Sequence, residues 1–144
     1  MVCPETCSRR TAKALSTGGM VMGWVQVAIV VVVIGARLRA AGWLLVAGVL
    51  FTFGLLPLAL LGPLVADGFL APHAAWPLLV VADVLLLISA LTFPDGGDNG
   101  PLSPILSEAA ASSPLGNRVA TAGILTGAAY VTALVVLTVW TVVG

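Results

Sequence analysis

The chain has 144 residues, of which 60% are hydrophobic and 8% are charged, and its formal net charge is zero. Soluble domains carry about 25% charged residues, and disordered chains combine high charge with few apolar residues. The composition therefore excludes both of those classes, and the zero net charge argues against a nucleic-acid partner. An integral membrane protein remains, with the lipid bilayer as its first partner.

Four stretches are long and apolar enough to cross a bilayer, so we predict an all-α integral membrane bundle of four transmembrane helices. A hydrocarbon core about 30 Å thick needs about 20 mostly apolar residues in helical form. The stretches do not alternate apolar with polar residues, as the strands of a membrane barrel would. Within a membrane domain covering 18–143, the approximate spans are 18–36, 42–62, 76–93 and 119–143.

The segment before the first span, 1–17, is a basic tail with Arg9, Arg10 and Lys13. Lys and Arg residues concentrate in cytoplasmic loops, but here three lie on each side of the membrane in the predicted topology, so the count ties. We expect a multi-pass protein of the cell membrane with its N-terminus on the cytoplasmic side. The preference for Arg over Lys, with much Ala, Gly and Val, is typical of a GC-rich prokaryotic genome.

One proline lies within a predicted span, and two longer segments connect the later spans. Pro57 lies inside the second span, where we expect it to kink the helix and free a backbone carbonyl. The connection 65–75 holds Asp67 and the only histidine, His73. The segment 94–118 is rich in Pro, Gly, Ser and Asp, and we expect it to be a loop exposed to water.

A polar residue lies near the middle of each predicted span. Asp83 is the one ionisable side chain deep inside a span, and Gln26, Thr52 and Tyr130 lie at similar depth in the other three. We expect a central polar layer in which Asp83 is either protonated or hydrogen-bonded by Gln26 and Tyr130. Such a layer acts either as polar glue worth about 1 kcal/mol per contact or as a proton or cation site.

Small residues mark the faces where membrane helices approach closely. Two predicted spans contain the pattern G-x-x-x-G, and in a third a glycine shares a face with the mid-depth threonine. These glycines predict close helix packing within the bundle or against a partner. The predicted packing residues are Gly19, Gly23, Gly48, Gly123 and Gly127.

The sequence offers no familiar catalytic set, so we expect no enzymatic activity, no metal site and no cofactor. One histidine in a connection cannot build a haem or catalytic metal centre within one chain. We expect a non-enzymatic subunit or scaffold that packs as a homo-oligomer or inside a larger membrane complex. The alternative is a small oligomeric transporter coupled to protons or cations through Asp83.

Overall fold

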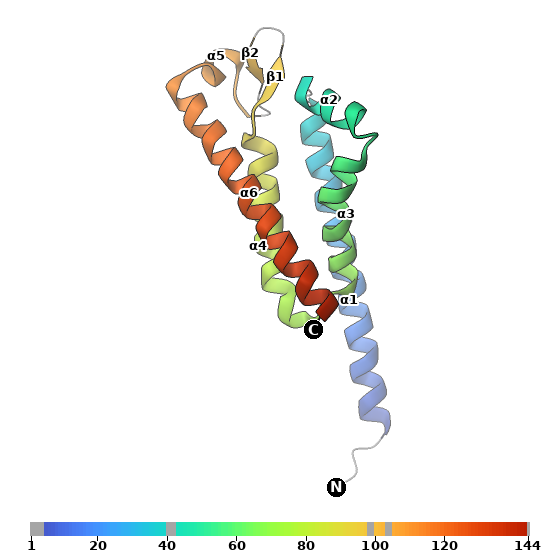
Figure 1. The fold of residues 1–144 in the computed structure, drawn as a ribbon. Helices are drawn as coiled ribbons and strands as arrows, with labels where there is room; N and C mark the ends of the chain where they lie inside the picture. The colour runs from blue at the N-terminus through green and yellow to red at the C-terminus, as the bar shows by residue number, and fades with distance from the viewer. Residues whose placement is uncertain (1–4, 40–42, 98–99, 103–104, 144) are drawn as a thin grey trace.

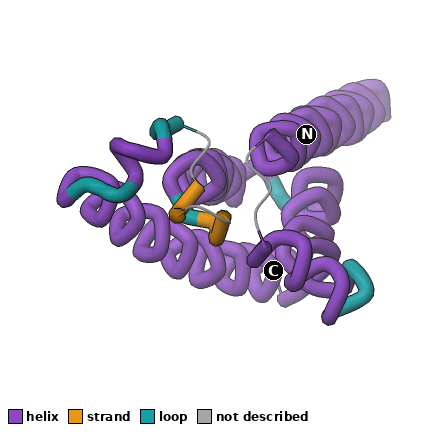
Figure 2. The backbone as a smooth tube through the Cα atoms, turned by 90° about the horizontal axis from the view of Figure 1, so that it is seen from above, coloured by secondary structure: helices purple, strands orange, loops and turns teal. Residues whose placement is uncertain are grey.

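The structure is a computed structural model that describes residues 5–39, 43–97, 100–102 and 105–143. Almost all of this backbone is helical (Figure 2), so the predicted helical class is confirmed. The elements in chain order are α1 Glu5–Arg39, α2 Trp43–Phe51, α3 Leu55–Leu70, the 3-10 turn η1 His73–Ala75, α4 Trp76–Thr92, β1 Asp95–Gly97, β2 Gly100–Leu102, α5 Glu108–Ala111 and α6 Pro114–Val143.

The long helices form two antiparallel pairs, α1 with α3 and α4 with α6 (Figure 1). The pairs converge at the end where α3 turns into α4, which we call the lower end. They lie apart at the opposite, upper end, which carries α2, β1, β2 and α5. The start of α1 and the end of α6 both lie toward the lower end, because the chain reverses direction after α1, α3 and α4.

Among the residues that the structure describes, three helices, not the predicted four, are long and apolar enough to cross a membrane. They cover Gly18–Arg39, His73–Thr92 and Pro114–Val143. The remaining long helix of the bundle is α3. Its 16 residues rise only about 24 Å at 1.5 Å per residue, which is less than the thickness of about 30 Å of the hydrocarbon core of a bilayer. The prediction of four full spans is therefore not confirmed.

The second predicted span, 42–62, is interrupted between α2 and α3. Phe53 and Gly54 both adopt positive φ, at 51° and 77°. The amide of Gly54 donates to the Val49 carbonyl at 2.9 Å and that of Phe53 to the Leu50 carbonyl at 3.3 Å, which is the Schellman pattern that ends a helix. The helix thus ends before Phe53 and Gly54, and a new helix begins at Leu55, two residues before the proline expected to kink it.

Three prolines occupy different positions in the helices α3 and α4, which follow the break. Pro57 is the third residue of α3, where a backbone N–H has no partner within the helix, so its missing donor costs little. Pro63 lies in the interior of α3 and leaves the carbonyl four residues earlier without its helical donor. Pro77 lies in the first turn of α4, as its position predicts.

The segment 94–118, predicted to be an exposed loop, contains regular structure at the upper end. Strands β1 and β2 pair antiparallel, with Asp95 opposite Leu102. Asp95 is buried, at 4% exposure. Helix α6 begins at Pro114, five residues before the predicted fourth span, because proline suits the first turn of a helix.

Glycines let the helices of each pair approach closely. A Cβ on Gly123 would lie 2.6 Å from the backbone nitrogen of Phe93, and a Cβ on Gly127 would lie 2.9 Å from Ser89 Oγ. On the other pair, Gly19 and Gly23 face Phe69, whose ring would lie 2.3 Å from a Cβ on Gly23. Both G-x-x-x-G patterns therefore pack inside one chain.

Gly48 does not belong to these seams. The nearest atom to a Cβ at this position is Leu56 Cδ2 at 3.8 Å, an ordinary contact. The packing role predicted for Gly48 fails because α2 ends soon after it and does not continue along a neighbouring helix.

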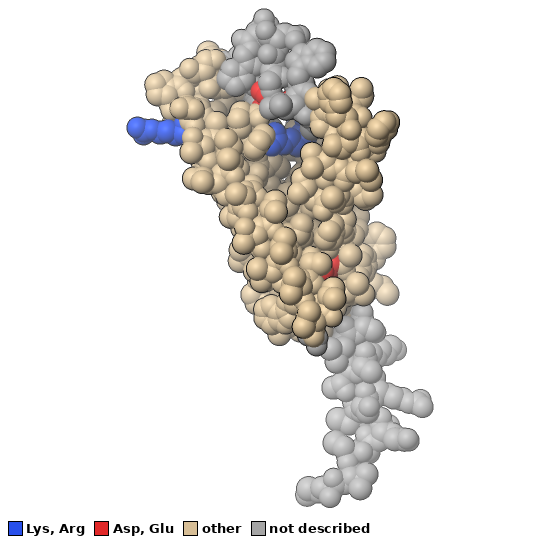
Figure 3. All heavy atoms as spheres, in the orientation of Figure 1, with Lys and Arg blue, Asp and Glu red and all other residues tan. Residues whose placement is uncertain are grey.

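Large apolar side chains cover the outside of the bundle. On the face shown in Figure 3, the coloured residues are mostly uncharged: Lys and Arg atoms appear near the upper end, and acidic atoms appear as small patches near the upper end and in the lower half. Trp24 is 64% exposed and meets Phe69 edge to face at 6.4 Å, and His73 stacks on Trp76 at 4.2 Å. Trp76 lies near the start of a candidate span, the position typical of a membrane-interface anchor.

The tight contact at Gly123 makes a test of the α4–α6 seam. We expect Gly123→Ala to lower the free energy of unfolding by about 1–3 kcal/mol, because the added methyl meets backbone that cannot turn aside. The matched control is Gly35→Ala, where no atom lies within 4 Å and alanine should stabilise the helix by about 0.5–1 kcal/mol. Thermal unfolding in detergent micelles measures both, and equal midpoints would contradict the seam.

Candidate functional site

The most deeply buried polar contact joins α1 to α4, and so joins the two helix pairs. Gln26 Nε2 donates to Asp83 Oδ2 at 2.9 Å. Gln26 is fully buried and Asp83 is 5% exposed. Both residues lie near the middle of their candidate spans, so their side chains would sit near the centre of a bilayer.

This contact leaves two oxygen atoms without partners. Gln26 Oε1 and Asp83 Oδ1 are buried and, among the residues that the structure describes, accept no hydrogen bond. An unpaired buried acceptor costs about 1–3 kcal/mol, and more if it is charged. Two such atoms within one hydrogen-bonded pair form a place where a proton or a cation could bind.

Two glycines explain how Gln26 comes to be buried so completely. A Cβ on Gly68 of α3 would lie 2.5 Å from Gln26 Cγ, and only 3.3 Å from the Cα of Gly23 on α1. The backbones of α1 and α3 therefore nearly touch beside the glutamine. Sequence reasoning missed Gly68 because it fell beyond the predicted second span.

The other two members of the predicted polar layer direct their hydroxyls to backbone carbonyls and not to the Gln26–Asp83 pair. Tyr130 is buried at 3% exposure, but its hydroxyl donates to the Leu60 carbonyl of α3 at 2.5 Å. Thr52 lies at the break after α2 and bonds the Gly48 carbonyl of its own turn. The described hydrogen bonds therefore bring together Gln26 and Asp83 of the predicted layer, while Tyr130 joins α6 to α3 and Thr52 lies at the upper end.

A second buried carboxyl lies in α3, where the sequence placed a connection. Asp67 is 4% exposed and its Oδ2 accepts from Thr138 Oγ1 of α6 at 2.9 Å. The prediction failed because helix α3 continues to Leu70. The spacing of Leu64, Asp67 and Gly68, which gives one helix face, is the signal that could have revealed it.

Arg37 of α1 binds the carbonyl end of α4. Its guanidinium donates to the carbonyls of Phe93 at 2.9 Å and Ser89 at 3.3 Å, and it lies 5.4 Å from the Phe93 ring centre. The last carbonyls of a helix carry partial negative charge, so a cation there is stabilising. Ser89 in turn donates to the Gly123 carbonyl at 3.2 Å.

A cavity of about 410 Å³ lies between the two pairs above Asp83. Its polar lining groups, Arg37, Ser89 and Tyr130, all donate to backbone carbonyls. The rest of its wall is mostly apolar, from Pro57, Leu60, Leu61, Leu86, Phe93, Ile124, Gly127, Ala128 and Val131. A smaller cavity of about 280 Å³ shares Arg37, Pro57, Leu60 and Phe93 and reaches Asp95. Together they make an apolar space at the upper half of the bundle.

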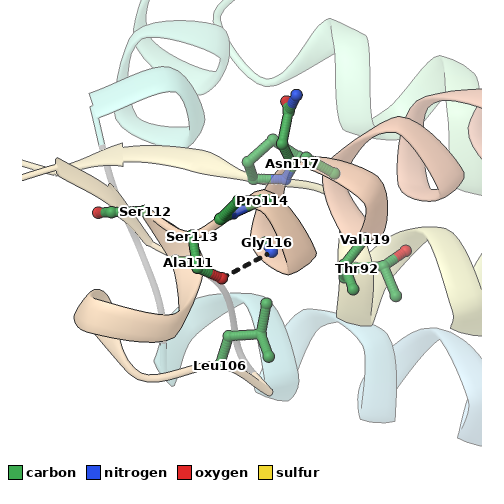
Figure 4. A pocket seen from close by; sticks show the side chains of 11 residues that line it. Thr92, Leu106, Ala111, Ser112, Ser113, Pro114, Gly116, Asn117 and Val119 are labelled. Atoms are coloured by element: carbon green, nitrogen blue, oxygen red, sulfur yellow. Dashed lines mark hydrogen bonds between the residues drawn. The ribbon is translucent and has the colours of Figure 1, made fainter.

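A separate pocket of about 550 Å³ lies where the turn between α5 and α6 meets the end of α4 (Figure 4). Two of its hydroxyls bond nearby carbonyls, Thr92 to Ile88 at 2.7 Å and Ser113 to Ala110 at 2.6 Å. Asn117 points away from the hollow. Nothing in this arrangement converges on a ligand. Within the described part of the chain, no group of three His, Cys, Asp or Glu residues is placed to hold a metal ion.

Comparisons with known proteins add no relative. No protein-family model, curated protein or solved structure matches the chain.

Thr138 provides a test of the buried Asp67. We expect Thr138→Val to destabilise the fold by about 1–3 kcal/mol, because it leaves a buried carboxyl oxygen without its donor. The control is Thr132→Val on the same helix, whose hydroxyl only bonds the exposed Ala128 carbonyl at 3.0 Å and whose loss should stay within about 0.5 kcal/mol. If chemical or thermal unfolding finds the two variants alike, the Asp67 contact is not stabilising.

Proposed function

We propose that this chain is a small multi-pass membrane protein that acts as a non-enzymatic subunit or scaffold, packing against a copy of itself or another membrane protein. The observation that carries the proposal is that α3, the fourth long helix of the bundle, is shorter than the three candidate membrane-spanning helices. Helix α3 starts only at Leu55, and the upper halves of the two pairs are separated by cavities of about 410 and 280 Å³ with mostly apolar walls. A further apolar helix would complete the bundle there.

The packing of the glycine faces supports an interface at the upper end of the bundle. Both G-x-x-x-G patterns are occupied inside the chain, so they do not offer a face to a partner. The side chains around the break remain open instead, with Phe51 at 84%, Phe53 at 93% and Leu55 at 65% exposure. In lipid, association depends on close packing, so the unfilled space beside the short helix α3 is what favours a further helix at the upper end.

Site-directed photo-crosslinking tests the proposal. We expect a benzophenone attached through Leu56→Cys, in a variant whose native cysteines Cys3 and Cys7 are replaced by serine, to give a protein adduct. Leu56 lines the smaller cavity. The matched control is Val32→Cys, on an exposed position of α1. A dimer-sized adduct in reconstituted liposomes indicates a copy, and a heavier adduct only in native membranes indicates a partner. Lipid adducts alone at both positions would contradict the proposal.

A second candidate function, transport coupled to protons or cations, is favoured by the two unpaired oxygens of Gln26 and Asp83. A carboxyl in mid-membrane that faces other helices is a functional candidate by default. In liposomes containing a pH-sensitive dye and held at an imposed potential, we expect Asp83→Asn to abolish proton flux. Asp67→Asn, which alters the carboxyl held by Thr138, should keep it. Wild-type flux equal to that of protein-free liposomes would contradict transport.

A further inference from the structure

The hydrogen-bonding atoms of Gln26 and Asp83 do not balance if the aspartate is ionised. One amide hydrogen is used in the bond from Nε2 to Oδ2, and the two remaining oxygens, Oε1 and Oδ1, are both acceptors without a donor. An ionised carboxylate has no hydrogen to donate. Turning the amide over therefore does not help, because the glutamine oxygen would still face a group that can only accept.

We propose that Asp83 binds one proton on Oδ1 and donates it to Gln26 Oε1, so that the two side chains form a neutral cyclic pair. The proton comes from water, and no other bond changes. The pair then has two hydrogen bonds, from Nε2 to Oδ2 and from Oδ1 to Oε1, and both unmatched acceptors are satisfied by one hydrogen. The bound proton also removes the net charge from this site. Neither side chain is more than 5% exposed, and burying an ionised carboxylate there would cost much free energy.

The charged and titratable groups on the elements packed against α4 do not supply an alternative partner. Arg37 of α1 is bound to carbonyls at the upper end. Asp67 of α3 accepts from Thr138, and the Tyr130 hydroxyl of α6 is held by the Leu60 carbonyl. His73 of η1 stacks on Trp76. No described cation bonds Asp83, so neutralisation by a proton is the arrangement that these neighbours allow.

A metal ion fits the same two oxygens less well. Hard divalent cations take six or more oxygen ligands, whereas the pair offers two, and the other described groups nearby are already engaged with carbonyls or with Thr138. A proton needs one donor position and one acceptor, which are the two atoms left over. The stoichiometry of the site therefore matches a proton.

Proton release would loosen the contact between the two helix pairs. Loss of the hydrogen from Oδ1 removes one of the two bonds between α1 and α4 and leaves a negative charge at mid-depth. Because the folded protein then holds a proton that the unfolded chain gives up more readily, stability is full at low pH and is lost as the pH rises through deprotonation of the folded state. The inference deepens the second candidate function, transport coupled to protons. The protonated pair does not itself depend on transport, and only its role in transport rests on that proposed function.

Infrared spectroscopy in reconstituted bilayers tests the inference without any transport assay. At neutral pH we expect the wild-type minus Asp83→Asn difference spectrum to show the C=O stretch of a protonated carboxyl, shifted by exchange into D₂O. The matched control, Asp67→Asn, should leave that band in place. In Gln26→Leu the band should move to higher frequency, because the acid loses the amide oxygen to which it donates.

Stability measurements give a second readout. The asparagine side chain offers one N–H donor and one oxygen acceptor in the positions of the protonated acid, so Asp83→Asn should fold and its thermal midpoint should not fall at alkaline pH as that of the wild type does. The inference is overturned if no protonated band belongs to Asp83 at neutral pH, if Asp83→Asn does not fold, or if adding sodium or potassium ions removes the band. Absent proton flux with the band present contradicts transport alone.

Discussion

The interior of a bilayer offers no hydrogen bonds, so each polar group placed there must find its partner in the protein. This constraint organises the bundle. The contact between Gln26 and Asp83 joins α1 to α4, the contact between Thr138 and Asp67 joins α6 to α3, and Tyr130 also reaches α3. Each of these bonds links one helix pair to the other, whereas apolar contacts alone would give little preference for one arrangement in lipid.

Glycines and polar side chains therefore have different roles. Gly123 and Gly127 hold α6 against α4, and Gly23 with Gly68 holds α1 against α3. The polar bonds then fix how the two finished pairs face each other. Arg37 completes the arrangement at the upper end by holding the carbonyls at the end of α4. The cavities above Asp83 remain open although Arg37 and Tyr130, which line the larger one, both bond across the two pairs.

Sequence reasoning could predict the helical class and the glycine seams, because long apolar runs and four-residue spacing determine both. It could also place Gln26 and Asp83 at similar depth. Depth alone does not give the direction in which a side chain points, so the partners of Thr52 and Tyr130, the carbonyls of Gly48 and Leu60, could not be predicted. The break at Phe53 and Gly54 was hidden because a bulky residue occupies the left-handed position where glycine is usual. Asp67 and Gly68 were missed with the true extent of α3.

The divergence of the two pairs gives the molecule a taper: it is broad at the upper end and narrow where α3 turns into α4 (Figures 1 and 3). In a bilayer, a body of this outline takes up more area in the leaflet that receives the broad end than in the other.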